Sequence, residues 1–180
     1  NHKLTTVNKV EATTKKTGIK AHYKCSGCSK LFSDATGKNE VTKSALTIPV
    51  EKKVAAAKGS IIKDKNGNKY KVTKSSVKNG TVTYVSPKNK KITSIKIADT
   101  VKVDGITYKI TAISKNAFSG CKKLKKVTIG KNVTKILAYL FYPYDGSYAP
   151  KIISVEFEDG SVCESIGEFA FSGCEALTKL

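Results

Sequence analysis

Cys25 and Cys28, separated by two residues, are the side chains of this sequence best placed to bind a metal or form a disulfide. Two thiolates at this spacing on a turn provide half of a zinc knuckle, and a structural zinc normally needs four ligands. Of the two histidines, His2 and His22, the second lies close before the pair. We expect a local disulfide or a reduced thiol pair and therefore no bound metal. A zinc site formed by Cys25, Cys28 and His22 is the alternative.

A group of aromatic residues is the second feature that could recognise a ligand. Four of the eight tyrosines fall within residues 139–148, in a segment that also contains proline and glycine. Aromatic rings on such a loop can stack against sugar or peptide surfaces. We expect Tyr142, Tyr144 and Tyr148 to bind ligand. The alternative is that Tyr139 and Phe141 lie in the core and the other tyrosines cover only the base of their own loop.

No pattern in the sequence favours catalysis. Paired carboxylates, a phosphate-binding loop, a nucleophile elbow and a histidine-rich metal motif are all missing, and no acid is placed to orient His22 toward a nucleophilic Cys25. The sequence therefore predicts a protein that is not an enzyme and needs no cofactor.

The strongly basic charge does not predict recognition of a nucleic acid. The net charge is +19, and all 33 basic residues are lysine. Arginine is the residue that forks onto guanine edges and phosphates, whereas lysine spread through turns is typical of a solvated face. We expect no specific nucleic acid partner. We also expect no membrane insertion, because no run of about 18 apolar residues occurs.

The elements that must position these residues begin with a short unit. Residues 1–50 contain few apolar side chains and predict a small β module that closes with a strand at 42–50. A unit of about 50 residues usually needs a disulfide, a metal or a partner to be stable. Residues 51–59 predict a linker. From 60 to 110, short alternating runs separated by Asn-Gly and Asp-Gly turns predict a β-meander.

The last part of the chain is repetitive. An aromatic anchor, Ile-x-x-x-Ala/Leu-Phe, recurs at spacings of 23 and 30 residues and ends at Phe118, Phe141 and Phe171. A triplet of apolar residues also recurs, with two residues between the first and second members and one residue between the second and third. Its copies lie at 92–97, 124–129 and 152–157 and, in part, at 177–180. Each triplet ends in an alternating strand, so stacked copies should form a parallel sheet.

The outward face of that sheet is another candidate binding surface. Its expected columns are Ser94, Lys126 and Ser154, and Lys96, Thr128 and Glu156. We expect Lys96, Lys126, Thr128 and Glu156 to contact a ligand, because solenoids bind through such faces. Cys121 and Cys174 occupy equivalent positions of two repeats, so we expect small buried side chains there.

The repeats resemble the BspA-type leucine-rich repeat, whose unit is close to I-G-x-x-A-F-x-x-C-x-x-L-x-x-V-x-I-x-x-x-V-x-x-I, over about residues 92–180. The matching residues are Ala117, Phe118, Cys121, Leu124, Val127, Ile129, Val133 and Ile136. The resemblance implies a mainly β fold, a leucine-rich-repeat solenoid with a parallel sheet and short helical or irregular turns. With a β-meander cap, this domain would span 60–180 and follow a small N-terminal β module.

The first unit resembles a small module found in tandem on cell-surface proteins of gut Firmicutes. The matching residues are Tyr23, Cys25, Cys28, Phe32, Asp34, Gly37, Ile48 and Pro49. Related sequences often carry a further cysteine in an Ala-Thr-Cys-Thr context, where this chain has Ala12-Thr13-Thr14.

The resemblances imply a non-catalytic, extracellular adhesion module on the cell surface or cell wall of a bacterium, with a host or cell-surface protein or a polysaccharide as partner. The alternatives are an accessory wall- or substrate-binding region of a larger secreted hydrolase or peptidase, and a structural spacer. Because the sequence starts without a leader and ends inside a repeat, we expect a monomeric segment of a longer chain.

Overall fold

The structure is a computed structural model, and it describes residues 2–13, 16–50, 52–142 and 150–180. Within these ranges, no helix is both long and apolar enough to cross a membrane.

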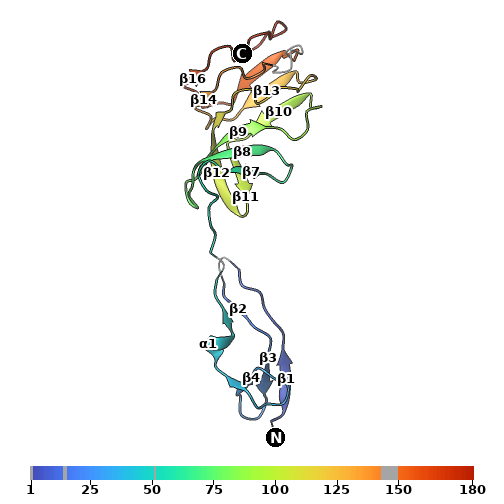
Figure 1. Cartoon of the computed structure of the whole chain (residues 1–180), viewed down its shortest axis with the longest axis vertical. Coiled ribbons are helices and arrows are strands. Elements are labelled where there is room, and N and C mark those ends of the chain that lie inside the picture. The colour runs from blue at the N-terminus through green and yellow to red at the C-terminus, as the bar shows by residue number, and fades with distance from the viewer. Residues whose placement is uncertain (1, 14–15, 51, 143–149) are drawn as a thin grey trace. The chain divides into compact units, whose positions relative to one another are not determined.

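Contacts between Cα atoms divide the chain into two compact units, shown in Figure 1. Asn1–Lys53 is the N-terminal unit, and Val54–Leu180 is the repeat unit. The expected division into 1–50, 51–59 and 60–180 stays a prediction, because compactness does not show that either unit folds by itself.

Four antiparallel strands form the main sheet of the N-terminal unit, in the order β1-β3-β4-β5. They are β1 (Leu4–Val7), β3 (His22–Cys25), β4 (Leu31–Phe32) and β5 (Glu40–Val41). Leu4 pairs with Cys25, so the residues before β1 lie beside the turn that follows β3. Two further short strands, β2 (Gly18–Ile19) and β6 (Thr47–Ile48), pair with each other in antiparallel orientation.

The strand expected at 42–50 is wrong over its first half. Residues Lys43–Leu46 form a single helical turn, α1, whose N-cap is Thr42. The Thr42 hydroxyl accepts a 3.3 Å hydrogen bond from the backbone N–H of Ala45, a local bond that competes with pairing in a sheet. The turn buries Leu46, and the chain becomes extended again in β6.

In the repeat unit, the apolar triplets form the parallel sheet that the sequence predicts. Its strands are β10 (Ser94–Ile97), β13 (Lys126–Ile129) and β15 (Ser154–Phe157). They pair in the expected register, which confirms the two outward columns. The start of a further copy is visible where Lys179 forms a parallel bridge with Ser154.

A second sheet runs in the order β7-β8-β9-β12-β14-β16, and β11 pairs with β12. The strands are β7 (Ile61–Lys63), β8 (Lys69–Lys74), β9 (Thr81–Ser86), β11 (Thr100–Val103), β12 (Ile106–Ile113), β14 (Lys135–Ile136) and β16 (Ser165–Ile166). Pairing is antiparallel from β7 to β9 and parallel from β9 to β16. Figure 1 shows β14 and β16 on one side of the repeat unit and β10 and β13 on the other.

The predicted meander is correct for β7, β8 and β9 and for the hairpin of β11 and β12, whereas residues 92–97 follow the triplet prediction instead. This segment leaves the meander and pairs in parallel with β13 as the first copy of the triplet. The register places Ile97 beside Ile129, and both side chains are buried. Pairing with β13 thus removes an apolar side chain from water, which favours this arrangement over a longer meander.

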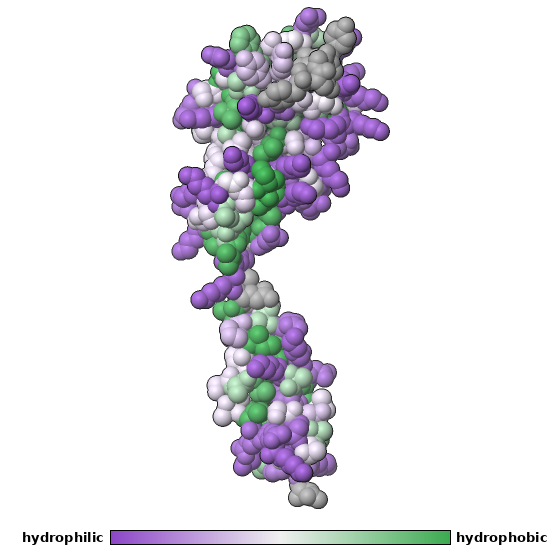
Figure 2. Space-filling model, in the orientation of Figure 1, coloured by the Kyte–Doolittle hydropathy of each residue, from purple (hydrophilic) through white to green (hydrophobic). Residues whose placement is uncertain are grey.

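An aromatic spine, defined as Tyr84, Phe118, Phe141 and Phe171, runs through the interior of the repeat unit. Successive ring centroids are 6.0, 5.4 and 6.0 Å apart, and Tyr70 packs edge-on against Tyr84 at 5.4 Å. Phe118 and Phe141 are fully buried. Around the spine, the repeat positions Leu124, Val127, Ile129, Val133 and Ile136 are also buried. The outside of the same unit is largely hydrophilic, with a band of hydrophobic residues on the face shown in Figure 2.

Replacing Phe118 with alanine should destabilise the repeat unit by about 3–5 kcal/mol, because it leaves a cavity between two rings of the spine. Denaturant unfolding followed by circular dichroism measures this loss. Val162→Ser is the control, since it removes an exposed apolar side chain of the same unit and should change stability by less than about 0.5 kcal/mol. A loss below about 1 kcal/mol for Phe118→Ala would contradict the spine's central role.

Candidate functional site

The sheet face, defined as the outward side chains of β10, β13 and β15, carries four of the residues that the sequence predicts as ligand contacts. Lys96, Thr128 and Glu156 stand in one row across the three strands, and Lys126 lies in the adjacent row. Parallel pairing thus brings together side chains that are up to 60 residues apart in sequence. The structure places these four residues on one surface, and their role in binding stays a prediction.

Ion pairs across the strands neutralise much of the charge on the sheet face. The Glu156 carboxylate lies 2.8 Å from the Lys126 ammonium and 3.2 Å from that of Lys179. Lys96 pairs with Glu158 at 2.5 Å. Hydrogen bonds from the two lysines lower the pKa of Glu156 to about 2. Since each lysine already has a carboxylate partner, this face is not built to bind a polyanion.

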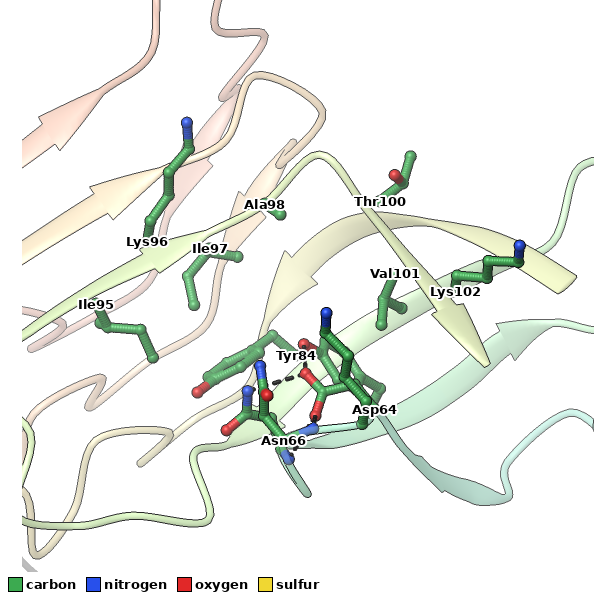
Figure 3. A pocket seen from close by; sticks show the side chains of 13 residues that line it. Asp64, Asn66, Tyr84, Ile95, Lys96, Ile97, Ala98, Thr100, Val101 and Lys102 are labelled. Carbon is green, nitrogen blue, oxygen red and sulfur yellow. Dashed lines mark hydrogen bonds between the residues drawn. The ribbon is translucent and has the colours of Figure 1, made fainter. Parts of the chain in front are cut away.

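A pocket of about 500 Å³ lies between the turn after β7 and strands β10 and β11 (Figure 3). The Asp64 carboxylate accepts hydrogen bonds from the Tyr70 hydroxyl at 3.0 Å and from the backbone N–H of Asn66 at 2.8 Å. Burial, with the charge of Asp64, raises the pKa of Tyr70. The Tyr84 hydroxyl is buried and has no hydrogen-bond partner in the described chain. The Asp64 carboxylate therefore stabilises the turn after β7 through hydrogen bonds within its own hairpin.

An exposed aromatic patch, defined as Tyr139, Tyr142 and Phe169, lies where the sequence predicts a recognition loop. The three side chains are 37%, 47% and 60% exposed. Tyr139 stacks on Phe169 with ring centroids 5.4 Å apart and contacts Tyr142 edge-on at 5.6 Å. Tyr142 is therefore exposed as expected, but Tyr139 is at the surface and not in the core. Tyr144 and Tyr148 lie outside the described residues.

The backbone holds the patch in an unusual conformation. Tyr139 and Phe169 have φ angles of 57° and 54°, and Asn116 has 55° at the same position of the preceding repeat. Each of the three residues stands two places before the phenylalanine of its anchor. Hydrogen bonds link the copies, from the Asn116 N–H to the Tyr139 carbonyl at 3.1 Å and from the Tyr139 N–H to the Glu168 carbonyl at 3.0 Å. The Asn116 side chain also donates to the Tyr142 carbonyl at 3.1 Å.

Phe169 is the functional candidate that the sequence analysis missed. Phe169 and Tyr139 occupy the same position relative to the phenylalanine of their anchors, so an alignment of the anchors indicates that the two side chains are neighbours. Positive φ is uncommon for residues other than glycine and asparagine, and for a bulky side chain it is an outlier. A sequence pattern gives the spacing of residues but not their φ angles, so it does not predict that Tyr139 and Phe169 stack on the surface.

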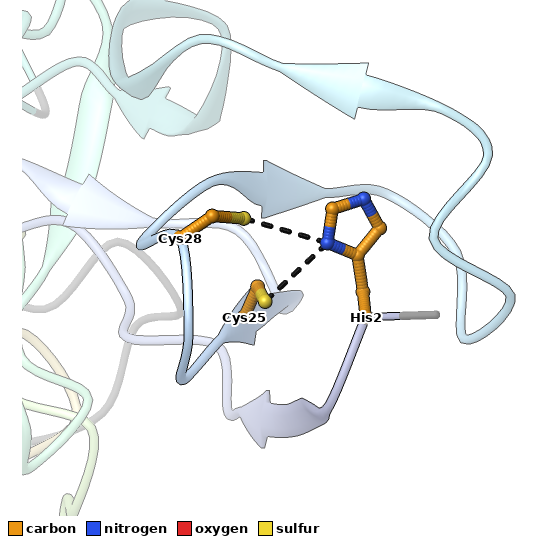
Figure 4. Close-up of side chains that lie close together, drawn as sticks. All are labelled: His2, Cys25 and Cys28. Carbon is orange, nitrogen blue, oxygen red and sulfur yellow. Dashed lines mark hydrogen bonds between the residues drawn. The ribbon is translucent and has the colours of Figure 1, made fainter.

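The two cysteines of the N-terminal unit lie beside a histidine, but not the one expected. His2 Nδ1 is 3.4 Å from the sulfur of Cys25 and 3.4 Å from that of Cys28 (Figure 4). His22 is buried, and its Nδ1 instead lies 2.9 Å from the Lys20 carbonyl oxygen. Across the described residues, His2, Cys25 and Cys28 form the one group of three potential metal ligands.

The cysteines of the repeats are packing residues, as the sequence predicts. Cys121 is 1% exposed and Cys174 is 9% exposed, and both belong to the hydrophobic core. Burial raises the pKa of Cys121 and raises that of Cys174 to about 11, so both stay thiols at neutral pH. Because a thiol is a poor nucleophile, neither residue is placed for covalent chemistry.

Comparisons with known proteins agree with this architecture. The family model described as the BspA type leucine rich repeat region matches residues 88–180 in 6 copies. The fold is similar to that of a leucine rich cell surface protein from Faecalibacterium prausnitzii (TM-score 0.54, 23% identity, 67% of this chain and 30% of that chain). It is also similar to the pneumococcal vaccine antigen PcpA (TM-score 0.51, 23% identity, 69% of this chain and 38% of that chain). This chain thus spans about a third of the length of these two structures. No curated protein matches it.

The ion pairs of Glu156 predict a measurable pH dependence. Its carboxyl should titrate near pH 2 in the folded chain, against about 4.3 when unfolded. Because the folded pKa is lowered, the stabilisation is present above the unfolded value and is lost as the pH falls from about 5 to about 2. Lys126→Met should raise the Glu156 pKa, as measured by carbon-13 NMR of the labelled carboxyl. Lys102→Met is the control on β11, and an unchanged Glu156 pKa in Lys126→Met would contradict the assignment.

Proposed function

Because the chain belongs to the BspA-type leucine-rich repeat family, we propose that its repeat unit is a non-catalytic binding module of a bacterial surface protein. In this proposal it acts outside the cell, at the cell surface or wall, and mediates adhesion by binding a polysaccharide or protein of a host or another cell. The similarity to a protein described as a leucine rich cell surface protein supports the location.

The exposed aromatic patch is the observation that carries this proposal. Holding a residue other than glycine in a left-handed conformation costs on the order of 1 kcal/mol or more. Tyr139 and Phe169 both have this conformation, and both expose an apolar ring to water. The first repeat has asparagine at the same position, so the fold does not require an aromatic side chain there. A cost that folding does not require is typical of a functional surface.

The geometry of the patch favours a sugar ring as the ligand. The rings of Tyr139 and Phe169 are nearly parallel, with an interplanar angle of 17°, and Tyr142 stands almost perpendicular to Tyr139 at 68°. Tyr139 and Phe169 thus offer an apolar aromatic surface, and the ring and hydroxyl group of Tyr142 lie beside it. The C–H face of a pyranose is also flat and apolar, and its hydroxyl groups can bond to the phenol. Protein ligands are the alternative outcome of the test.

The other residues that the sequence predicts as ligand contacts are proposed as further contacts. Tyr144 and Tyr148 follow Tyr142 in the sequence and are proposed as further aromatic contacts. Lys96, Lys126, Thr128 and Glu156 are proposed as polar contacts on the sheet face. Because Glu156 is paired with lysine, these residues would add hydrogen bonds and orientation more than net charge attraction.

The combined variant Tyr139→Asn, Tyr142→Ser, Phe169→Asn tests the proposal. Binding of the 180-residue chain is measured on an array of mucin, wall polysaccharides and extracellular-matrix proteins. We expect the variant to bind its ligand at least about 10-fold more weakly, since an aromatic hot spot contributes about 2 kcal/mol or more. Its melting temperature should not fall, because asparagine tolerates positive φ.

The control is Ile61→Ser, which removes an exposed apolar side chain from β7 in the same unit. It should bind like the unmodified chain. Unchanged binding by the combined variant would show that the patch is not the recognition site, whichever ligand the array identifies.

A further inference from the structure

We propose that the N-terminal unit binds one Zn²⁺ ion through His2 Nδ1 and the sulfurs of Cys25 and Cys28, with a solvent molecule as the fourth ligand. The proposal concerns a different unit from the aromatic patch and does not depend on the function of the repeats.

The distances among the three side chains fit a zinc ion. With Zn–S of about 2.3 Å and Zn–N of about 2.0–2.1 Å, tetrahedral geometry places a sulfur and a nitrogen ligand about 3.5 Å apart. His2 Nδ1 lies 3.4 Å from each sulfur, and the three ligand atoms are all within 4.8 Å of one another. An ion could therefore enter with little movement of the side chains.

A hydrogen bond alone explains this arrangement less well. His2 Nδ1 carries at most one hydrogen, and a single N–H should turn toward one acceptor at the expense of the other. In the structure the nitrogen is equally distant from the two sulfurs. Equal distances of this kind are the geometry that a metal ion bound to all three atoms requires.

The backbone prepares the site before any ion binds. Pairing of β1 with β3 continues past Leu4, because the Ser26 N–H donates to the Lys3 carbonyl at 2.9 Å. This register fixes His2 opposite the Cys25–Cys28 turn. The turn is closed by the Ser29 N–H, which donates to the Cys25 carbonyl at 3.0 Å, and Ser29 has a φ of 60°.

Packing around the imidazole restricts its orientation. The His2 ring lies 4.7 Å from that of Phe32, which is 2% exposed. On another side is Gly37, with a φ of 71°, where an added Cβ would approach the His2 ring to 3.3 Å. The Asp34 carboxylate holds this turn by accepting a 2.8 Å hydrogen bond from the Asn39 N–H. Supported ligand side chains of this kind are typical of metal sites.

Ligand chemistry selects zinc. Two thiolates and one imidazole form a soft to borderline set, which suits tetrahedral Zn²⁺ and does not suit Mg²⁺ or Ca²⁺. Three protein ligands leave one position for water, as in zinc sites with a Cys₂His set.

The N-terminal unit also has little else to stabilise it. Its buried apolar residues in the described ranges are Ala12, Cys25, Phe32 and Leu46. Domains this small commonly depend on a metal or a disulfide, and the free energy of metal binding then contributes to folding. Zinc at this position would tie the residue before β1 to the end of β3 and to the turn between β3 and β4.

The test measures zinc bound to the full 180-residue chain, purified under reducing conditions without chelators, loaded with zinc chloride and desalted. Mass spectrometry of the metal should give one zinc per chain. Competition with a chromophoric chelator should show that His2→Ala and Cys28→Ser each weaken zinc binding more than about 100-fold, since even outer-shell changes cost about 10–100-fold. Both side chains are exposed, so neither change opens the core.

Cys163→Ser is the matched control, because it removes a partly buried thiol from the repeat unit and should leave zinc binding unchanged. Cobalt in place of zinc should give the visible absorption bands of a tetrahedral thiolate site. Substoichiometric zinc, equal affinity in His2→Ala, or octahedral cobalt bands would each overturn the proposal. So would a Cys25–Cys28 disulfide that persists in the zinc-loaded chain, seen as a peptide mass lower by two hydrogens.

Discussion

Ring stacking along the axis of the repeats is the interaction on which the rest of the repeat unit depends. Tyr84, Phe118, Phe141 and Phe171 place one ring at each level, and the distances between neighbouring ring centroids stay at 5.4–6.0 Å although the sequence spacings are 34, 23 and 30 residues. The stack therefore keeps a similar rise between successive levels although the repeats differ in length. A single copy could not bury its own phenylalanine, so the repeats are stable only together.

The same stacking explains where a binding surface can form. The residue two places before each phenylalanine has a left-handed backbone, and in the second and third copies its side chain is exposed. Asparagine is the conformationally suitable choice and occurs at Asn116. Tyr139 and Phe169 replace it with exposed rings in the next two copies, one directly above the other. A second periodic stack thus lies on the surface, produced by the geometry that builds the first.

The N-terminal unit is stabilised by other interactions than the repeat unit. Among its described residues few apolar side chains are buried, and its main sheet consists of strands of two to four residues. Local hydrogen bonds therefore have more influence, as at Thr42, where a capping bond replaces the expected strand with α1. In the same unit, the register of β1 with β3 brings His2 to the cysteine pair across more than twenty residues of sequence.

The sequence by itself determined the repeat unit, because apolar side chains at fixed offsets can be buried in essentially one stacked register. That pattern predicted the parallel pairing of β10, β13 and β15, their outward columns, and the buried Cys121 and Cys174. Tertiary structure alone decided which histidine meets Cys25 and Cys28, since strand pairing and not sequence distance places His2 there. It also decided that Tyr139 and Phe169 face solvent, because a side chain's direction depends on the sign of φ, which residue type does not specify.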